Sequence, residues 1–266
     1  MSDHLPVLSV EGVCLKFDER DILRDVRFAV QRGELVGVVG GNGAGKTSLV
    51  NVITGYYTAS QGQVKVDGKT LTGGARNATR MGVRRSFQSV AAFTGMSLLE
   101  FVLLGDEPLW RSTIPGAYFS TRRARREEAR SRVAVRELLS SAQIKDVDEQ
   151  MEKSSYGERK LADVLRAILG EGRIVLLDEP TSGLSSAEKH VVRDEILRRH
   201  NADAGVIIID HDIAFVGSIC DRMIGLVDGA VVVDGPVAEV LENEKMIASF
   251  IGKRSYADRK TTLRED

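Results

Sequence analysis

Short apolar runs recur along the chain, with helical stretches between them. Leu35–Val39, Ile174–Leu177 and Val206–Ile209 lack the polar alternation of a half-exposed strand. Such runs are typical of strands buried on both faces of a parallel sheet. Ser186–Arg199 and Ile213–Cys220 follow two of the runs and show the pattern of helices. This alternation predicts an α/β fold with a mainly parallel sheet.

The N-terminal region has the pattern of short, partly exposed strands. Val7–Val10, Val13–Phe17 and Val26–Val30 are β-rich segments, and Gly62–Asp67 alternates between polar and apolar residues before an Asp-Gly turn. Val83–Gln88 is predicted to form a further strand. These segments predict an antiparallel β arm beside the parallel sheet.

A helical insertion is predicted between the arm and the later βα units. From Ser97 to about Ile144 the pattern is helical, with breaks at Pro108 and around Pro115–Gly116, because proline interrupts a helix. Next comes an amphipathic helix, in which Leu161, Val164, Leu165, Ile168 and Leu169 share one face. The chain is therefore predicted to combine a parallel sheet, a β arm and a helical insertion.

Composition and charge narrow the class of protein. The chain has 266 residues, 42% of them hydrophobic, and a formal net charge of -1. This length suits one large domain or a domain with a subdomain, and the charge provides no field that would draw the chain to nucleic acid or lipid. Cys14 and Cys220 lack metal-binding spacing and predict two reduced thiols in a cytosolic protein. Neither a signal peptide nor a membrane span is expected.

A glycine-rich turn, Gly40–Thr47, separates the run Leu35–Val39 from a helix-like stretch, Ser48–Thr54. Glycines let backbone N–H groups close around an anion, and a helix N-terminus adds partial positive charge. Lys46 would reach the β- and γ-phosphates, and the Thr47 hydroxyl would bind Mg²⁺. A chance glycine-rich loop with a lysine is the alternative. The strand before the turn and the helix after it favour a P-loop that binds a nucleoside triphosphate.

Two carboxylates, Asp178 and Glu179, follow a buried run and precede Pro180. The C-terminal edge of an open α/β sheet is where its ligands bind. Asp178 would help to hold Mg²⁺, and Glu179 would polarise the attacking water. A solvated Asp-Glu turn is the alternative. In a chain that already has a P-loop, the pair favours hydrolysis over binding alone.

Ser155 and Glu158 have the spacing of a capping box at the start of the amphipathic helix. The simpler interpretation is a well-capped helix. The alternative is a second phosphate-binding helix terminus, in which the Ser155 hydroxyl and the Gly157 N–H donate to a γ-phosphate. One chain needs a single phosphate cradle, so the nucleotide at this second site would belong to another subunit.

These motifs occur in the order found in the ATP-binding subunits of ABC transporters, which the chain resembles over nearly its whole length. The matching motifs are the Walker A loop (Gly40–Thr47), the Q-loop glutamine (Gln88), the signature (Ser155–Glu158), Walker B with its glutamate (Ile174–Glu179), the D-loop start (Ser182–Leu184) and the switch histidine (His211). Taken alone, Gln88 or His211 would be read as a structural residue. Their place relative to the Walker motifs favours a functional role.

The resemblance implies roles for specific residues. It implies nucleotide contacts by Phe17, Gly40, Gly41, Asn42, Gly43, Ala44, Gly45, Lys46, Thr47 and Ser48, and across the dimer by Ser155, Gly157 and Glu158. It implies Mg²⁺ binding by Thr47, Gln88 and Asp178, and catalysis by Glu179, His211, Gln88 and Lys46. The cofactors would be ATP and Mg²⁺.

The resemblance also implies a domain plan. Residues 1–266 would form a single ABC ATPase domain. The antiparallel β arm and RecA-like core would cover about 6–90 and 160–252, the helical subdomain about 91–160, and a polar tail 253–266.

Some positions depart from the family pattern. Ser154 stands where leucine is usual, Ser185 where many members have the D-loop aspartate, and Gly41 where proline is frequent. Tyr156-Gly157-Glu158 resembles the variant signature of the branched-chain amino-acid transporter group. We therefore expect an active enzyme, with Ser154 and Ser185 bearing on coupling between subunits.

Longer features suggest the same subgroup. The insertion after Gly105 and the tail from Val240 to Gly252 are similar to ATPases of branched-chain amino-acid and of urea or short-amide uptake systems. His211–Val216 leans toward the urea type. The arginine-rich run 122–126 is read as a solvated helix face, with contact to anionic lipid or permease loops as the alternative.

The resemblance finally implies partners. The chain would form a homodimer or heterodimer with a second ABC ATPase at the cytoplasmic face of the membrane. It would bind two membrane permease subunits, be linked indirectly to an extracytoplasmic solute-binding protein, and bind no nucleic acid. A soluble ABC-type ATPase and an export or lipid-transport ATPase are the alternatives, together with a small-molecule P-loop kinase and a binding-only regulatory subunit.

Overall fold

A mostly parallel sheet of six strands runs through the described part of the chain. The computed structural model describes residues 5–87, 90, 93–105, 122–170 and 172–251. The strand order is β10-β9-β3-β8-β7-β6, in which β9 and β10 pair antiparallel and the other neighbours pair parallel. The strands are β3 (Leu35–Val39), β6 (Val83–Arg85), β7 (Ile174–Asp178), β8 (Gly205–Ile209), β9 (Arg222–Val227) and β10 (Ala230–Gly235).

The central strands are buried on both faces. Every residue of β3, β7 and β8 is buried, which confirms the prediction from their unbroken apolar runs. The strand predicted over Val83–Gln88 ends at Arg85, and Gln88 lies outside the described residues. The C-terminal ends of β3 and β7 lead into the P-loop and the Asp178-Glu179 pair.

A second, antiparallel sheet forms the β arm, in the order β2-β1-β4-β5. Its strands are β1 (Leu8–Phe17), β2 (Arg20–Val30), β4 (Gln61–Val66) and β5 (Lys69–Thr70). The expectation of two strands over 7–17 is wrong, because β1 continues through Gly12 with shifts in its register. Gly12 has a φ of 63°, which glycine adopts without steric cost.

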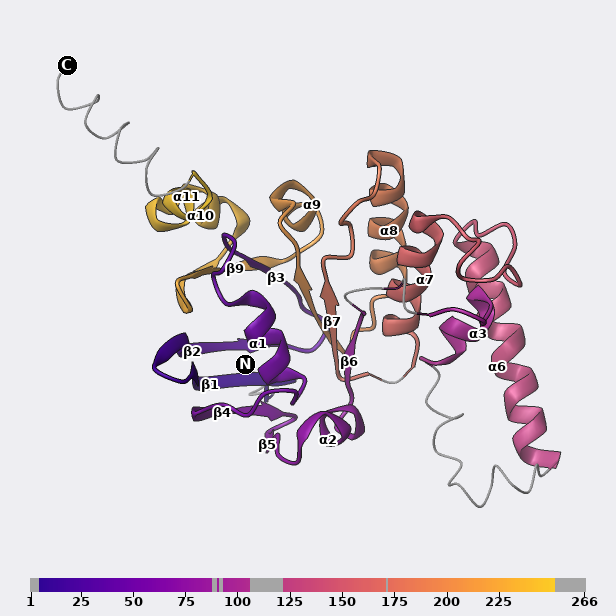
Figure 1. Ribbon diagram of the computed structural model, residues 1–266, viewed down its shortest axis with the longest axis horizontal. Coiled ribbons are helices and arrows are strands. Elements are labelled where there is room, and N and C mark those ends of the chain that lie inside the picture. Colours follow the sequence, from indigo (N-terminus) through magenta and orange to yellow (C-terminus); the bar gives the residue numbers. More distant parts are fainter. Residues whose placement is uncertain (1–4, 88–89, 91–92, 106–121, 171, 252–266) are drawn as a thin grey trace.

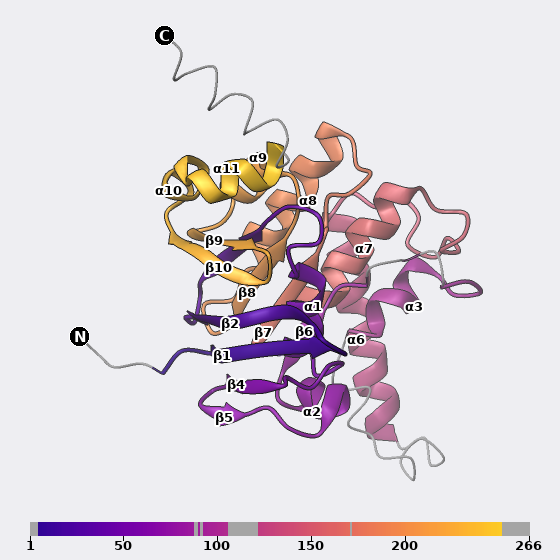
Figure 2. The same cartoon turned by 60° about the vertical axis from the view of Figure 1, so that its left-hand side comes forward.

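Helix α1 (Lys46–Ile53) lies between the two sheets. Its buried residues Leu49, Val50, Val52 and Ile53 belong to one apolar cluster with residues of β1, β2 and β4 on one side and β3, β7 and β8 on the other. Figure 2 shows the arm in front of this helix. Packing on both sides fixes the start of α1, and so the position of the P-loop that leads into it.

A second apolar cluster covers the opposite face of the six-stranded sheet and continues into the helical region on the right of Figure 1. The cluster takes in residues of α3 (Leu98–Leu103), α6 (Arg122–Ser141), α7 (Tyr156–Ile168), α8 (Ser186–Arg199) and α9 (Ile213–Gly217). The arginine-rich run 122–126 falls in α6. No helix within the described ranges is both long and apolar enough to cross a bilayer.

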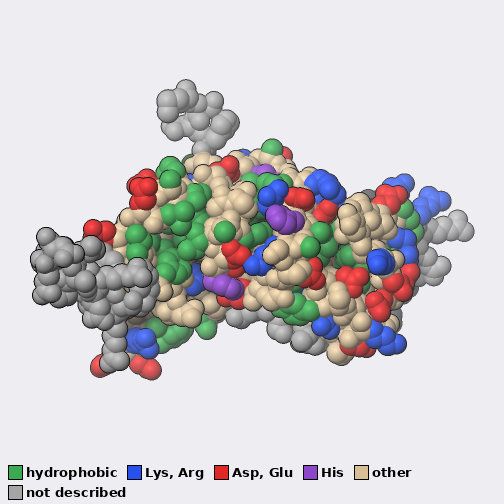
Figure 3. Space-filling view, turned by 90° about the horizontal axis from the view of Figure 1, so that it is seen from above, with side chains coloured by type: hydrophobic (Ala, Val, Ile, Leu, Met, Phe, Trp, Pro, Cys, Tyr) green, Lys and Arg blue, Asp and Glu red, His purple; other side chains and the backbone are tan. Residues whose placement is uncertain are grey.

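Three further helices had no counterpart among the predicted elements. They are α2 (Gly74–Arg80), α10 (Val237–Glu242) and α11 (Glu244–Ile251). The last two carry an apolar patch, visible beside the grey segment on the left of Figure 3. A cavity of about 210 Å³ lies there, lined by Val39, Ile213, Val240, Leu241, Met246, Ile247 and Phe250. Val39 is the last residue before the P-loop.

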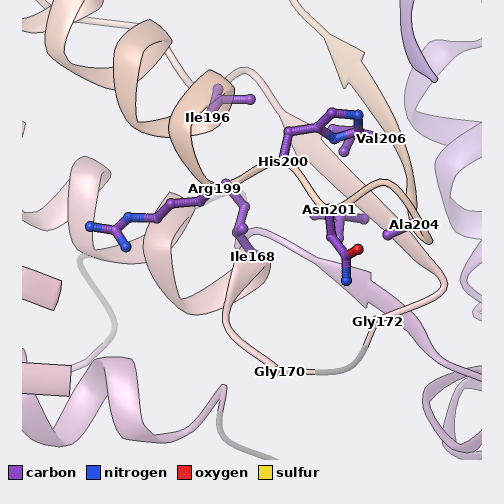
Figure 4. Close-up of a pocket in the computed structure, with 10 residues that line it drawn as sticks. Ile168, Gly170, Gly172, Ile196, Arg199, His200, Asn201, Ala204 and Val206 are labelled. Carbon is purple, nitrogen blue, oxygen red and sulfur yellow. The ribbon is translucent and has the colours of Figure 1, made fainter. Parts of the chain in front are cut away.

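A small cavity of about 20 Å³ lies at the opposite edge of the sheet, near the first residues of β7 and β8 (Figure 4). His200 points into it from the end of α8, and its Nε2 lies 2.7 Å from the Gly33 carbonyl oxygen. Nε2 therefore carries the proton, and within the described part of the chain the buried Nδ1 has no hydrogen-bond partner.

Candidate functional site

The P-loop is shaped by its own glycines and supported by the turn between β9 and β10. Gly43 and Gly45 have φ values of 78° and 101°, which close the loop between β3 and α1. The Gly229 N–H donates to the Ala44 carbonyl at 3.0 Å, so the β9–β10 turn supports the loop from outside. The N-cap of α1 is Gly45, and among the described residues no side chain caps this helix. Its first N–H groups therefore suit a bound phosphate.

Lys46 lies at the first position of α1 and points back over the loop. Its Nζ donates to the carbonyl oxygens of Gly40 at 2.7 Å and Gly41 at 3.0 Å. Burial lowers the pKa of Lys46, and the charges of Glu179 and Asp178 act in the opposite direction. The structure thus places the predicted phosphate-binding lysine where the charges of both predicted carboxylates act on its pKa.

Gly41 is required by contact with the C-terminal helix. A Cβ at this position would lie 2.8 Å from the Ser249 carbonyl oxygen of α11. That distance is too short for a side chain to fit without movement of backbone. The glycine at this position therefore lets α11 pack directly against the phosphate loop.

Asp178 ends β7 and is buried. Its Oδ2 accepts a hydrogen bond from the Arg85 guanidinium at 2.8 Å, and its N–H donates to the Ser86 hydroxyl at 2.8 Å. A second Arg85 nitrogen donates to Asn51 Oδ1 of α1 at 2.8 Å. The carboxylate of Asp178 and the exposed hydroxyl of Thr47 are oxygen donors of the kind that hold Mg²⁺ together with nucleotide phosphates, so the residues present fit this ion.

Glu179 has an unusual backbone conformation. Its φ of 48° is rare for a residue other than glycine, and such strain is found at functional sites. The Glu179 N–H donates to the Ile209 carbonyl at 2.7 Å, and the Lys160 Nζ donates to the Glu179 carbonyl at 3.0 Å. The backbone of Glu179 is thereby fixed by the neighbouring strand and by α7.

His211 follows β8, next to Glu179 along the same sheet edge. Its side chain is 63% exposed, and its Nδ1 lies 3.4 Å from Oδ1 of the fully buried Asp210. Asp210 also accepts hydrogen bonds from the Thr181 hydroxyl at 2.6 Å and the Asp212 N–H at 3.0 Å. Asp210 therefore joins the segments that carry Glu179 and His211, while the imidazole remains open to solvent.

The predicted capping box at Ser155 is confirmed. The Ser155 hydroxyl accepts from the Glu158 N–H at 3.1 Å, and the Glu158 carboxylate accepts from the Ser155 N–H at 3.0 Å. A Cβ on Gly157 would meet Glu188 Oε1 at 2.0 Å, so this glycine permits close contact between α7 and α8. Ser155 is exposed, as a role toward a second subunit would require.

Two positions that depart from the family pattern have local partners. Ser185 caps α8 in a box with Glu188, whose pKa is lowered by hydrogen bonds from Ser185. The Ser154 hydroxyl is buried and donates to the Gln150 carbonyl at 3.0 Å. Ser185 therefore stabilises the start of α8, and Ser154 stabilises the turn that leads to α7.

Phe17 ends β1 with 45% of its surface exposed. Its ring meets that of Tyr57 edge-on, with centroids 5.2 Å apart and an interplanar angle of 83°. The edge contact leaves the rest of the ring available for stacking on a flat base.

Replacement of Phe17 with Ala is expected to weaken ATP binding roughly tenfold, because base stacking contributes about 1–3 kcal/mol. Phe17→Trp keeps a stacking surface and is the matched control. Isothermal titration calorimetry with Mg-ATP measures both variants. Unchanged affinity in Phe17→Ala would remove Phe17 from the adenine site.

Sequence reasoning missed the charged residues that organise the site. Arg85 holds Asp178, and Lys160 holds the Glu179 carbonyl. The sequence contained one signal, since Lys160, Asp163 and Arg166 fall among the apolar residues of an amphipathic helix and are all buried. Buried charges need partners, but the sequence does not name those partners.

Comparison with known proteins agrees with this geometry. The family model described as ABC transporter matches residues 23–182. The high-affinity branched-chain amino acid transport ATP-binding protein BraF of Pseudomonas aeruginosa is 28% identical over 251 residues, covering 93% of this chain and 98% of BraF. LivG of Escherichia coli K12, with the same description, is 28% identical over 253 residues, covering 93% and 98%. Among solved structures, an ABC transporter ATP-binding cassette in its ADP conformation has a TM-score of 0.78 at 25% identity, covering 93% and 99%.

Proposed function

This chain belongs to the ABC transporter family as an ATP-binding subunit with ATPase activity, and we propose that it powers uptake of branched-chain amino acids through separate membrane permease subunits. The observation that carries the chemistry is the meeting of the P-loop, Asp178 and Glu179 at one edge of the sheet, where both carboxylates act on the pKa of Lys46. A phosphate-binding loop beside two carboxylates is the arrangement that phosphoryl transfer to water needs.

The chain's own residues have distinct tasks in this proposal. Lys46 moves its hydrogen bonds from the loop carbonyls to the β- and γ-phosphates. Glu179 orients water for in-line attack and accepts its proton, while His211 stabilises charge that develops on the γ-phosphate. Thr47, Asp178 and Gln88 would hold Mg²⁺, which supplies charge neutralisation between the phosphates. Gln88 lies outside the described residues, so its part depends on the resemblance alone.

The proposed reaction chamber is completed by a second chain. Ser155 caps the exposed start of α7, and the Gly157 N–H lies in the first turn of that helix. In the proposal these groups, with Glu158, face the γ-phosphate of a nucleotide bound to the partner's P-loop. The functional unit would be a homodimer, or a heterodimer with a second ABC ATPase, that closes on ATP and opens after hydrolysis.

A groove of about 900 Å³ is a candidate docking site for a permease subunit. It lies between the end of α1, helix α2 and strand β6 on one side and the end of α3 on the other, and it reaches Phe87, the residue before Gln88. Four arginines line it: Arg80, Arg84, Arg85 and Arg166. We propose that a cytoplasmic segment of the permease docks in this groove and places the chain peripherally at the membrane.

The nature of the solute is proposed from the relatives. Both relatives described above are branched-chain amino acid transport proteins, and the variant signature agrees with that group. Urea or a short amide is the second candidate, on the residues His211–Val216. In either case an extracytoplasmic solute-binding protein would deliver the solute to the permease, and the solute would not touch this chain.

Reconstitution tests the function directly. The chain is combined with its permease subunits and binding protein in proteoliposomes, and phosphate release is measured with and without leucine, isoleucine or valine. Solute is expected to raise ATP hydrolysis several-fold, because substrate-loaded binding protein favours the closed dimer. Urea and acetamide are tested in parallel at equal concentration.

The outcomes separate the candidates. Stimulation by urea or acetamide alone would replace the branched-chain proposal with the second one. Phosphate release that no solute changes, in vesicles that contain all the subunits, would contradict uptake as the function. Glu179→Gln in the same vesicles controls for contaminating ATPases.

A further inference from the structure

A buried ion pair on α7 binds the segment that leads to Gln88. Asp163 is 1% exposed and Arg166 is 8% exposed. Arg166 donates twice to Asp163 Oδ1, from Nε at 3.0 Å and from a terminal nitrogen at 2.8 Å. The second oxygen, Asp163 Oδ2, accepts from the Phe87 N–H at 2.7 Å. One carboxylate thus links an arginine of the helix to the backbone before Gln88.

Arg166 adds two contacts to the same segment. Its terminal nitrogen donates to the Arg85 carbonyl at 2.8 Å. Its guanidinium carbon lies 3.9 Å from the centre of the Phe87 ring, in cation–π geometry. The ion pair therefore holds both a carbonyl and an N–H of residues 85–87, along with the Phe87 side chain.

The same segment is attached on its other side to the nucleotide site. The Arg85 side chain bonds Asp178 of β7 and Asn51 of α1. A continuous chain of hydrogen bonds thus runs from α1 and β7, through β6, to α7. The turn that follows α3 is also in close contact with α7, since a Cβ on Gly105 would lie 2.1 Å from the Arg166 carbonyl oxygen. Movement of residues 85–87 would therefore act on α7 through Arg166.

Stability alone is a weak explanation for this pair. Removing two charges from water is costly, and replacing a buried pair by apolar residues is often neutral or stabilising. A pair that also bonds the backbone of another segment, at the Phe87 N–H and the Arg85 carbonyl, instead fixes the relative position of the two segments. Ser155 and Gly157 are at the other end of α7, so the pair also sets where they lie.

We propose that Asp163 and Arg166 are positioning residues that couple residues 85–87 to α7, the helix that begins at the signature residues. We call this pair and its bonds to residues 85–87 the clamp. Ser155 and Gly157 reach the partner's nucleotide only when the clamp is intact. This rests on the proposed function, in which two chains enclose each ATP. The clamp acts on closure of the dimer and leaves binding of ATP to the chain's own P-loop unchanged.

The experiment uses the full chain with Glu179→Gln, which keeps bound ATP from being hydrolysed. Analytical ultracentrifugation measures dimer formation against Mg-ATP concentration, and a fluorescent ATP analogue measures binding at protein concentrations where the chain is monomeric. Asp163→Asn with Arg166→Met is expected to weaken ATP-driven dimerisation about tenfold or more, with analogue binding within roughly twofold. This double variant removes both charges of the pair together and is expected to fold.

Two further variants keep the test sharp. Arg166→Lys preserves the charge but loses the planar group that contacts Asp163 Oδ1 with two nitrogens and the Arg85 carbonyl with one of them, so its dimerisation is expected to fall between the parent and the double variant. Glu195→Gln with Arg199→Met is the matched control, because Glu195 is a buried acid paired at 2.7 Å with Arg199 within α8. The control is expected to dimerise like the parent, and melting temperatures compare the stability of all variants.

The clamp is overturned if the double variant dimerises like the parent, if the α8 control weakens dimerisation equally, or if monomeric ATP binding falls in step with dimerisation. Failure of the parent itself to dimerise with ATP would overturn the two-chain site, and the clamp with it. The proposal is supported if the parent and the α8 control dimerise with ATP and the double variant dimerises more weakly.

Discussion

Glu179→Gln is expected to lower phosphate release by about 100-fold or more, with ATP affinity unchanged, because loss of a general base commonly costs a factor of 10²–10⁴. The amide keeps the size of the side chain but cannot accept the proton of the attacking water. The Glu179 N–H and carbonyl are held by Ile209 and Lys160, so the backbone geometry should survive the change. A coupled phosphate assay gives the rate, and calorimetry with Mg-ATP gives the affinity.

The matched control for this variant is Glu137→Gln, the same chemical change on the exposed face of α6. It is expected to hydrolyse ATP at the parental rate. Phosphate release within a few-fold of parental in Glu179→Gln would refute the role of Glu179 as base. An equal loss of affinity and rate would instead indicate that the carboxylate contributes to ATP binding.

The sequence predicted the parts of the site that depend on neighbouring residues. The loop Gly40–Thr47, the buried run before Asp178 and the capping box at Ser155 are local patterns, each set within a few positions of the chain. Glycine at positive φ, unbroken apolar runs and Ser-x-x-Glu spacing have direct conformational consequences. The structure therefore confirms the strands and helix caps at these places.

Contacts between distant segments could not be predicted in the same way. Arg85 meets Asp178 across 93 positions of the sequence, and Phe87 meets Asp163 across 76. Many partners could satisfy a buried arginine, and a single sequence does not choose among them. The clamp and the contact of Arg85 with Asp178 follow from the fold, which brings β6, β7 and α7 together.

Weak local signals explain the missed elements. Helix α2 has one buried residue, Ala78, and so shows no apolar periodicity. Strands β9 and β10 surround Asp228-Gly229, a dipeptide typical of hairpin turns, and their pairing adds the antiparallel edge of the sheet. This edge matters for the site, because its turn supports Ala44 of the P-loop.

Lys46→Ala is expected to weaken Mg-ATP binding roughly 100-fold, because a charged hydrogen bond contributes about 1.5–3 kcal/mol. The loss arises because the ammonium group, which bonds the carbonyls of Gly40 and Gly41 in this structure, would no longer be present to bind the β- and γ-phosphates. Calorimetry with Mg-ATP measures the affinity, and the rise in melting temperature on adding ATP gives an independent measure.

The charges around Lys46 make the direction of this effect firm. Asp178 and Glu179 both act to raise the pKa of the ammonium group against the effect of burial, so its removal would leave less positive charge to offset these carboxylates when a triphosphate binds. Lys46→Arg keeps the charge and should retain part of the affinity, while Lys69→Ala on the exposed strand β5 should bind ATP like the parent. Unchanged binding in Lys46→Ala would mean that the nucleotide does not sit on this loop, and the assignments of Asp178 and Glu179 would then have no phosphate to act on.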